Sequence, residues 1–254
     1  MINKLFTLVI FSIIFTTVSA QIVNIENQRL KTKKDGFSGY INLNLNLTYA
    51  TKQLFQIGGQ SKVAYSKKKN YLMLLTDYSL VTSSFNEDFI NKGFEHVRNN
   101  YTFKASGRVI FEAFHQGQFN EIQKINKRLL LGSGLRFLII NQKKYQLSYG
   151  SSVMGEYEEM DLDVPIISQD ILSSNYISFD GQFNSVFGMN IITYFQPKFI
   201  DFGNYRVASE TQLRFKINKY LSLKIIYKIN HDSRDLQDVR KTYYSLTNVL
   251  SFKF

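Results

Sequence analysis

Residues Ile41–Tyr49 read INLNLNLTY, and apolar and polar side chains alternate along this stretch without a break. Successive side chains of a strand point to opposite faces, whereas apolar residues of an amphipathic helix recur at every third or fourth position. The stretch therefore predicts a β-strand with one apolar face and one polar face.

The same alternation recurs along the chain, most clearly over 128–139, 145–157 and 205–216. We expect about twelve strands, at 37–49, 53–65, 70–81, 89–103, 107–119, 127–140, 144–158, 172–183, 186–196, 204–217, 220–230 and 241–254. Strands of this length, about twice that of strands in soluble domains, suit a tilted crossing of a bilayer. The sequence thus predicts an all-β fold, a transmembrane antiparallel β-barrel of the outer-membrane type with about twelve strands (roughly 10–14).

The connections between the predicted strands give a second indication. Short turns rich in lysine, such as those at 67–69 and 142–143, alternate with mostly longer connections that hold many of the aspartate and glutamate residues. The longest of these connections is at 159–171. Outer-membrane barrels alternate short periplasmic turns with longer outer loops in this way. We therefore expect the lysine turns to face the periplasm.

The first residues are typical of a secretory signal. Lys4 precedes the apolar run Leu5–Phe15, and small residues end the segment at Val18-Ser19-Ala20. We predict a cleaved signal peptide over 1–20, a short periplasmic lead over 21–35 and the barrel over 36–254. We expect export to the outer membrane of a Gram-negative bacterium. The net charge of +11 would otherwise suggest nucleic acid as a partner, but an exported protein does not meet it.

Composition excludes further mechanisms. The chain has 22 Phe and 16 Tyr but no Trp and no Cys. Without cysteine there is no disulfide framework, thiolate metal site, cysteine nucleophile or lipid-modified cysteine.

The C-terminal strand carries a further signal. Leu246, Leu250, Phe252 and Phe254 fall on one face, with Asn248 as the exception, and the chain ends on phenylalanine. This pattern resembles the signal read by the outer-membrane insertion machinery, which we expect as a partner together with outer-membrane lipid and lipopolysaccharide.

Segments from Asn91 onward resemble a known family. The runs NKGFEHVR at 91–98, EAFHQGQFN at 112–120, RLLLGSGLR at 128–136 and GEYE at 155–158 look like domain-of-unknown-function family 481, named after a salt-induced outer-membrane protein. The resemblance covers nearly the whole mature chain and implies an outer-membrane location with no established activity.

Catalysis and metal binding are weak hypotheses. His96 and His115 lie on neighbouring predicted strands near Glu95 and Glu112, but alternation places His115 opposite to Glu112. Acidic segments at 158–163 and 232–238 lack the regular spacing of a calcium loop, so solvation explains them better. We expect no cofactor and no metal.

Charged residues on the polar faces are the better candidate site. We expect an ion-pair lattice inside the barrel, because confined charges persist when they are paired or hydrated. Counting Lys228, the polar faces hold six positive against three negative residues, which favours anions. The lattice residues are Glu112, Arg128, Arg136, Glu156, Arg206, Glu210, Arg214 and Lys224.

The sequence therefore predicts a monomeric outer-membrane barrel, either structural or an anion-preferring channel for small solutes. Two alternatives remain open. One is an outer-membrane lipid-modifying hydrolase with an active-site histidine, and the other is a soluble lipocalin-like periplasmic binder.

Overall fold

The computed structural model of the chain describes residues 35–49, 53–83, 88–103, 107–236 and 239–252. The predicted signal peptide lies outside them, as does the predicted lead except Asp35. Within them no helix is long and apolar enough to cross a membrane.

Twelve strands follow one another in a single antiparallel sheet, each paired with the next. All twelve lie within a few residues of the predicted positions, except where noted below. They are β1 (Gly36–Tyr49), β2 (Gln53–Lys67), β3 (Asn70–Ser83), β4 (Asp88–Thr102), β5 (Val109–Asn120), β6 (Ile125–Asn141), β7 (Tyr145–Met160), β8 (Ile166–Gln182), β9 (Phe187–Pro197), β10 (Tyr205–Lys216), β11 (Leu221–Asp232) and β12 (Thr242–Phe252). The 3-10 turn η2 (Glu121–Gln123) lies between β5 and β6.

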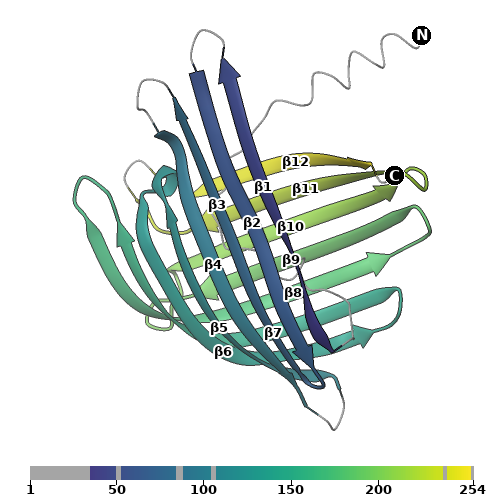
Figure 1. The fold of residues 1–254 in the computed structure, drawn as a ribbon. Coiled ribbons are helices and arrows are strands. Elements are labelled where there is room, and N and C mark those ends of the chain that lie inside the picture. The colour runs from purple at the N-terminus through teal and green to yellow at the C-terminus, as the bar shows by residue number, and fades with distance from the viewer. Residues whose placement is uncertain (1–34, 50–52, 84–87, 104–106, 237–238, 253–254) are drawn as a thin grey trace.

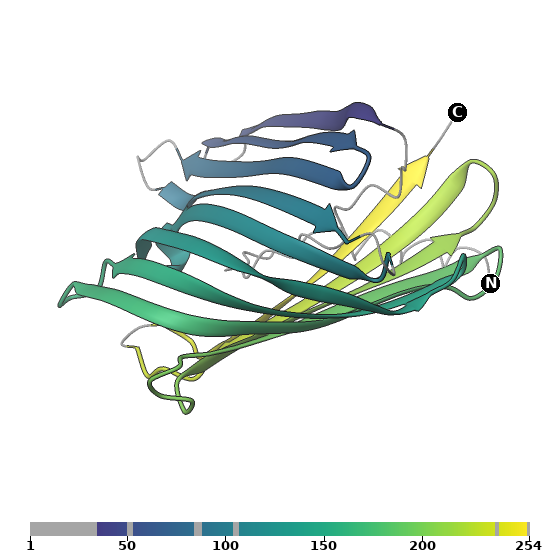
Figure 2. The same cartoon turned by 90° about the horizontal axis from the view of Figure 1, so that it is seen from below.

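The sheet curls so that its first and last strands form opposite walls around a common interior (Figures 1 and 2). Within the described residues no strand pairing joins β1 to β12, so these strands are the two edges of the curled sheet. Closure of the seam between them stays a prediction.

The two faces of the sheet have opposite character. On the outer face Leu131 is 68% exposed and Ile177 is 57% exposed, whereas on the inner face Arg128 and Glu156 are each 4% exposed. The alternation predicted for β6, β7 and β10 is confirmed. Soluble proteins bury apolar residues and expose charges, so this arrangement is inverted.

We call the two ends of the sheet the turn end and the loop end. The turn end holds the connections at 68–69, 103–108, 142–144, 183–186 and 217–220, together with the start of β1 and the end of β12. The loop end holds the connections at 50–52, 84–87, 121–124, 161–165, 198–204 and 233–241.

Local chemistry fixes several of the tight turns. The side-chain oxygen of Asn184 accepts bonds from the backbone amides of Val186 and Phe187, at 2.9 and 2.8 Å. In the connection between β10 and β11, the side-chain oxygen of Asn218 likewise accepts bonds from the backbone amides of Tyr220 and Leu221. Asparagine side chains commonly close turns in this way.

The predicted long connection at 159–171 is wrong. β7 continues to Met160 and β8 begins at Ile166, so the connection is 161–165. The adjacent isoleucines Ile166 and Ile167 break the alternation, and therefore the pattern concealed the start of β8. The difference in length between the two ends is smaller than predicted, since 103–108 at the turn end is longer than 161–165.

Candidate functional site

Ion pairs join strands that are not neighbours in the sheet. Arg206 on β10 donates from Nη1 to Oε2 of Glu156 at 2.6 Å and from Nη2 to Oε2 of Glu158 at 2.9 Å, both on β7. Because β8 and β9 separate β7 from β10, these bonds cross the interior. Arg128 on β6 adds a bond from Nε to Glu156 at 2.8 Å. We call Arg128, Glu156, Glu158 and Arg206, with Asp232 and Arg234 below, the charge lattice.

The connection between β11 and β12 completes the charge lattice. Arg234 enters from this connection and pairs with Asp232 at 2.7 Å and with Glu158 at 2.5 Å. Burial and the nearby Arg206 oppose its charged form, but Asp232 and Glu158 outweigh both and raise the pKa of Arg234 above its usual value. Arg234 therefore stays charged and ties this connection to the inner wall.

Little free space remains beside the charge lattice. A cavity of about 60 Å³ lies between Arg128, Arg206, Arg234 and Tyr243. Roughly 10–15 Å³ of such space is enough for one water molecule. The described residues thus leave room there for a few water molecules.

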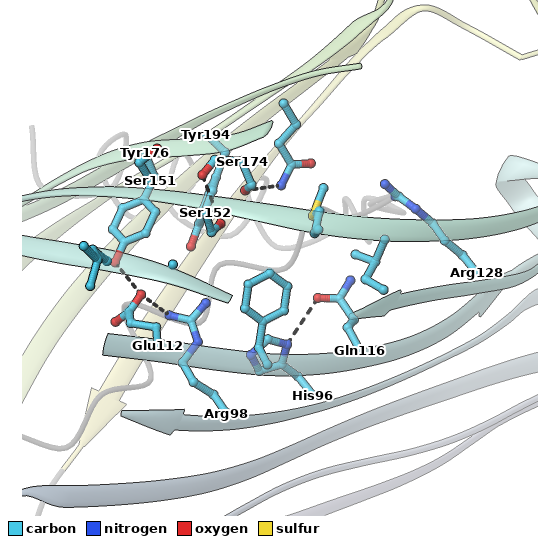
Figure 3. A pocket seen from close by; sticks show the side chains of 16 residues that line it. His96, Arg98, Glu112, Gln116, Arg128, Ser151, Ser152, Ser174, Tyr176 and Tyr194 are labelled. Carbon is cyan, nitrogen blue, oxygen red and sulfur yellow. Dashed lines mark hydrogen bonds and ion pairs between the residues drawn. The ribbon is translucent and has the colours of Figure 1, made fainter. Parts of the chain in front are cut away.

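A second polar cluster lies further toward the turn end (Figure 3). Glu112 on β5 accepts a bond from the Tyr176 hydroxyl at 2.9 Å and pairs with Arg98 at 3.4 Å. Nδ1 of His96 lies 3.3 Å from the side-chain oxygen of Gln116. The cavity among these residues measures about 40 Å³. Its size suits a few water molecules.

Other predicted lattice residues lie on the inner face outside these two clusters. Arg214 pairs with Asp180 at 3.0 Å, and Lys228 pairs with Glu210 at 3.4 Å. Arg136 donates to the Ser148 hydroxyl at 2.8 Å. Lys224 is the register partner of Arg214. Among the described residues, Lys224 forms no ion pair.

Crowding on the inner wall explains its small residues. A Cβ atom at Gly134 would lie 2.2 Å from the backbone oxygen of Ser151, and one at Gly132 would lie 2.5 Å from the ring of Phe114. Such distances admit no side chain, as expected for a close approach within a sheet.

Comparison with known sequences assigns the family. The sequence profile described as "Protein of unknown function, DUF481" matches residues 38–254. The chain belongs to this family. The resemblance seen in the sequence is thus confirmed, and no curated protein matches the chain.

Among solved structures, this DUF481 member is similar to two whose titles call them porins. One is "NanC porin structure in rhombohedral crystal form", at 15% identity and a TM-score of 0.47, covering 86% of this chain and 98% of the other. The second is "KdgM porin", at 10% identity and a TM-score of 0.39, covering 86% and 99%.

In this DUF481 chain, the sequence did not predict all of the charged residues that lie on the inner face. It assigned Glu158 and Asp232 to acidic loop segments, but they lie on β7 and β11 and bind arginine. Glu158 lies two residues after Glu156 on the same strand, so the alternation alone could have placed it on the inner face. By parity the inner face also adds Lys62, Lys92, Arg98 and Lys216 on the positive side and Asp77, Glu158, Asp170, Asp180 and Asp232 on the negative side. The excess of positive charge is smaller than predicted but remains.

The two candidate histidines, His96 and His115, lie on opposite faces. His96 is buried in the interior, whereas His115 lies on the outer face with Nδ1 4.0 Å from Glu95. The prediction that His115 and Glu112 point to opposite faces is confirmed. The described residues also hold no group of acidic, histidine or cysteine side chains arranged to hold a metal ion.

The structure describes only part of the predicted C-terminal insertion signal. Leu246 and Leu250 lie exposed on the outer face of β12. The side chain of Phe252 and all of Phe254 lie outside the described residues, so the signal stays a prediction.

Proposed function

We propose that this chain is a barrel of the Gram-negative outer membrane that serves as a narrow channel for small solutes. The main support for this proposal is the inverted sheet, which exposes apolar side chains on its outer face and buries ion-paired charges on its inner face. A lipid environment removes the cost of the apolar surface, and a confined lumen retains paired charges.

Aromatic rings on the outer face support the proposed membrane location. At the turn end, ring contacts run from Tyr145 through Phe179, Phe183 and Phe187 to Phe215. At the loop end, Tyr78 contacts Phe119, Phe195 contacts Tyr205, and Tyr157 lies under the Lys127 ammonium. Membrane barrels carry aromatic girdles at both interfaces.

The two alternatives fit the structure less well. A lipocalin-like binder in water places its apolar face inward around a ligand, and here that face points outward. A hydrolase needs a serine and an acid aligned with its histidine. The amide of Gln116 beside His96 supplies no orienting acid, and we propose a protein without catalytic activity or cofactor.

The proposed path through the barrel is narrow and weakly positive. Small cavities beside the charge lattice show that the interior is narrow there, where Arg234 reaches Glu158 from the loop end. Positive charge in a confined lumen favours anions.

We expect the refolded protein to conduct in a planar bilayer with a preference for chloride over potassium. Reversal potentials in a salt gradient measure this preference. Arg214→Gln combined with Lys224→Gln, both half-buried near the turn end, should lower it, and high salt should weaken it through screening. A cation-selective wild type would contradict the assignment, and absence of conductance would leave a plugged structural barrel.

The ends of the barrel give a topology prediction. A tag inserted after Asp163 at the loop end should react with a membrane-impermeant label on intact cells. A matched tag after Lys143 at the turn end should react only after the outer membrane is permeabilised. Labelling of the Lys143 tag on intact cells would reverse the proposed orientation.

We further propose that the barrel is monomeric and is inserted by the outer-membrane machinery, with lipid and lipopolysaccharide as its neighbours. The outward leucines of β12 support recognition by that machinery.

A further inference from the structure

A pocket of about 180 Å³ lies in the inner wall near the loop end, and it has three times the volume of the cavity beside the charge lattice. Because roughly 10–15 Å³ of such space is enough for one water molecule, this pocket admits a small organic solute. We call it the mouth pocket. Five inner-face side chains of β3, β4 and β5 line it, namely Asp77, Lys92, Phe94, Gln118 and Asn120.

Two opposite charges line the mouth pocket without pairing. Among the described residues, neither Asp77 nor Lys92 forms an ion pair with any side chain. Asp77 accepts one bond through Oδ2 from the Gln60 amide at 3.1 Å. Asp77 pairs in the register with Phe94, so Lys92 is its diagonal neighbour on the same face. Diagonal neighbours lie about 7–8 Å apart, which leaves room for a group between the two charges.

Two amide side chains add hydrogen-bonding atoms that the described part of the chain leaves unused. Asn120 is 5% exposed, and its buried Oδ1 atom accepts no bond there. Gln118 accepts a bond from Gln116 at 2.8 Å, but its amide nitrogen donates to no described residue. A buried acceptor without a partner is costly, and this points to a group that binds there. The mouth pocket thus offers two acceptors, on Asp77 and Asn120, and two donors, on Lys92 and Gln118.

A zwitterion matches this set of atoms. An ammonium group can donate to Asp77 and Asn120, and a carboxylate can accept from Lys92 and Gln118. Hydrogen bonds between ionised groups are the strong ones. A plain anion would leave the aspartate without a partner, and a plain cation would do the same to the lysine. The ring of Phe94 adds an apolar surface for a small side chain.

We propose that the mouth pocket binds one α-amino acid with a small apolar side chain, held as the zwitterion between Asp77 and Lys92. The site rests on the proposed function, because it names a class of solute that the channel takes. A zwitterion carries no net charge, so the weakly positive path does not repel it. Passage requires a site that binds weakly enough to release its solute, and no bond is made or broken.

Saturation-transfer NMR of the protein refolded in detergent micelles tests the site with three probes. L-Alanine carries both charges, propionate carries only the carboxylate, and ethylammonium carries only the ammonium. L-Alanine should bind about tenfold more tightly than either single-charge probe, the effect expected of one charge-assisted hydrogen bond. Equal binding of the three probes by the wild type, or no binding of L-alanine, would overturn the site.

Two variants should act on different probes. Lys92→Gln should weaken the binding of L-alanine about tenfold and also weaken that of propionate, but not that of ethylammonium. Asp77→Asn should weaken the binding of L-alanine and ethylammonium, but not that of propionate. A variant that weakened all three probes alike would contradict the assigned roles of the two charges.

Lys224→Gln is the matched control for Lys92→Gln. Lys224 is a half-buried lysine of the inner face that does not line the mouth pocket, and its substitution removes the same charge. It should bind L-alanine like the wild type. A loss of L-alanine binding as large as that of Lys92→Gln would show that net charge decides, and would overturn the site.

Conductance of the same protein in a planar bilayer separates the two proposals. Ion conductance without L-alanine binding contradicts the site alone. Binding of L-alanine without conductance supports the site and contradicts the channel.

Discussion

Glu156→Gln should lower the free energy of unfolding by about 3 to 5 kcal/mol, the cost expected when one partner of a buried ion pair is removed. Glu156 accepts bonds from Arg128 and Arg206, and its side chain is fully buried. A neutral amide would leave the two guanidinium groups undercompensated in the interior. Urea unfolding of the protein refolded in lipid measures the change.

Glu159→Gln provides the control on the same strand. Glu159 lies on the other face of β7 and accepts one exposed bond from Asn126 at 2.9 Å. Exposed substitutions of this kind change stability by about 0.5 kcal/mol or less. Equal losses from the two substitutions would show that the charge lattice does not hold the wall together.

Leu45→Arg should destabilise the barrel by about 2 to 4 kcal/mol, the cost of arginine facing lipid near the bilayer midplane. Leu45 lies in the middle of β1 and is 67% exposed on the outer face. The yield and stability of the protein refolded in lipid vesicles measure the effect.

Asn44→Arg tests the opposite face at the neighbouring position. Asn44 is exposed on the inner side of β1, so an arginine has room and, in a wet lumen, water to solvate it. We expect near-wild-type refolding. If the two arginines had the same effect, the assignment of inner and outer faces would be wrong.

The strands could be predicted from the sequence because each carries its own alternation. The period of two depends only on which face meets lipid and which meets the lumen. Ile41–Tyr49 in β1 and the segments within β6 and β7 needed no information from elsewhere in the chain. β8 was predicted too short because Ile166-Ile167 pairs with β7 through its backbone and shows no alternation.

Pairing within the lumen could be predicted only in part. Parity placed Arg128, Glu156 and Arg206 on the inner face, and the structure brings all three together. The contact between Arg206 and Glu158 depends on how far the sheet curls, which no local pattern reports. Arg234 lies in a connection, where alternation carries no information, and its place in the charge lattice follows only from the fold.

Quenching of a single tryptophan tests the central claim that the apolar face meets lipid. The chain contains no Trp, so Leu131→Trp on the outer face and Asn44→Trp on the inner face each introduce one fluorophore. After refolding into vesicles, brominated lipid should quench the Leu131→Trp protein strongly and the Asn44→Trp protein little, while aqueous acrylamide should show the opposite order. If acrylamide quenched the Leu131→Trp protein and brominated lipid did not, the outer face would be in water and the membrane barrel would be contradicted.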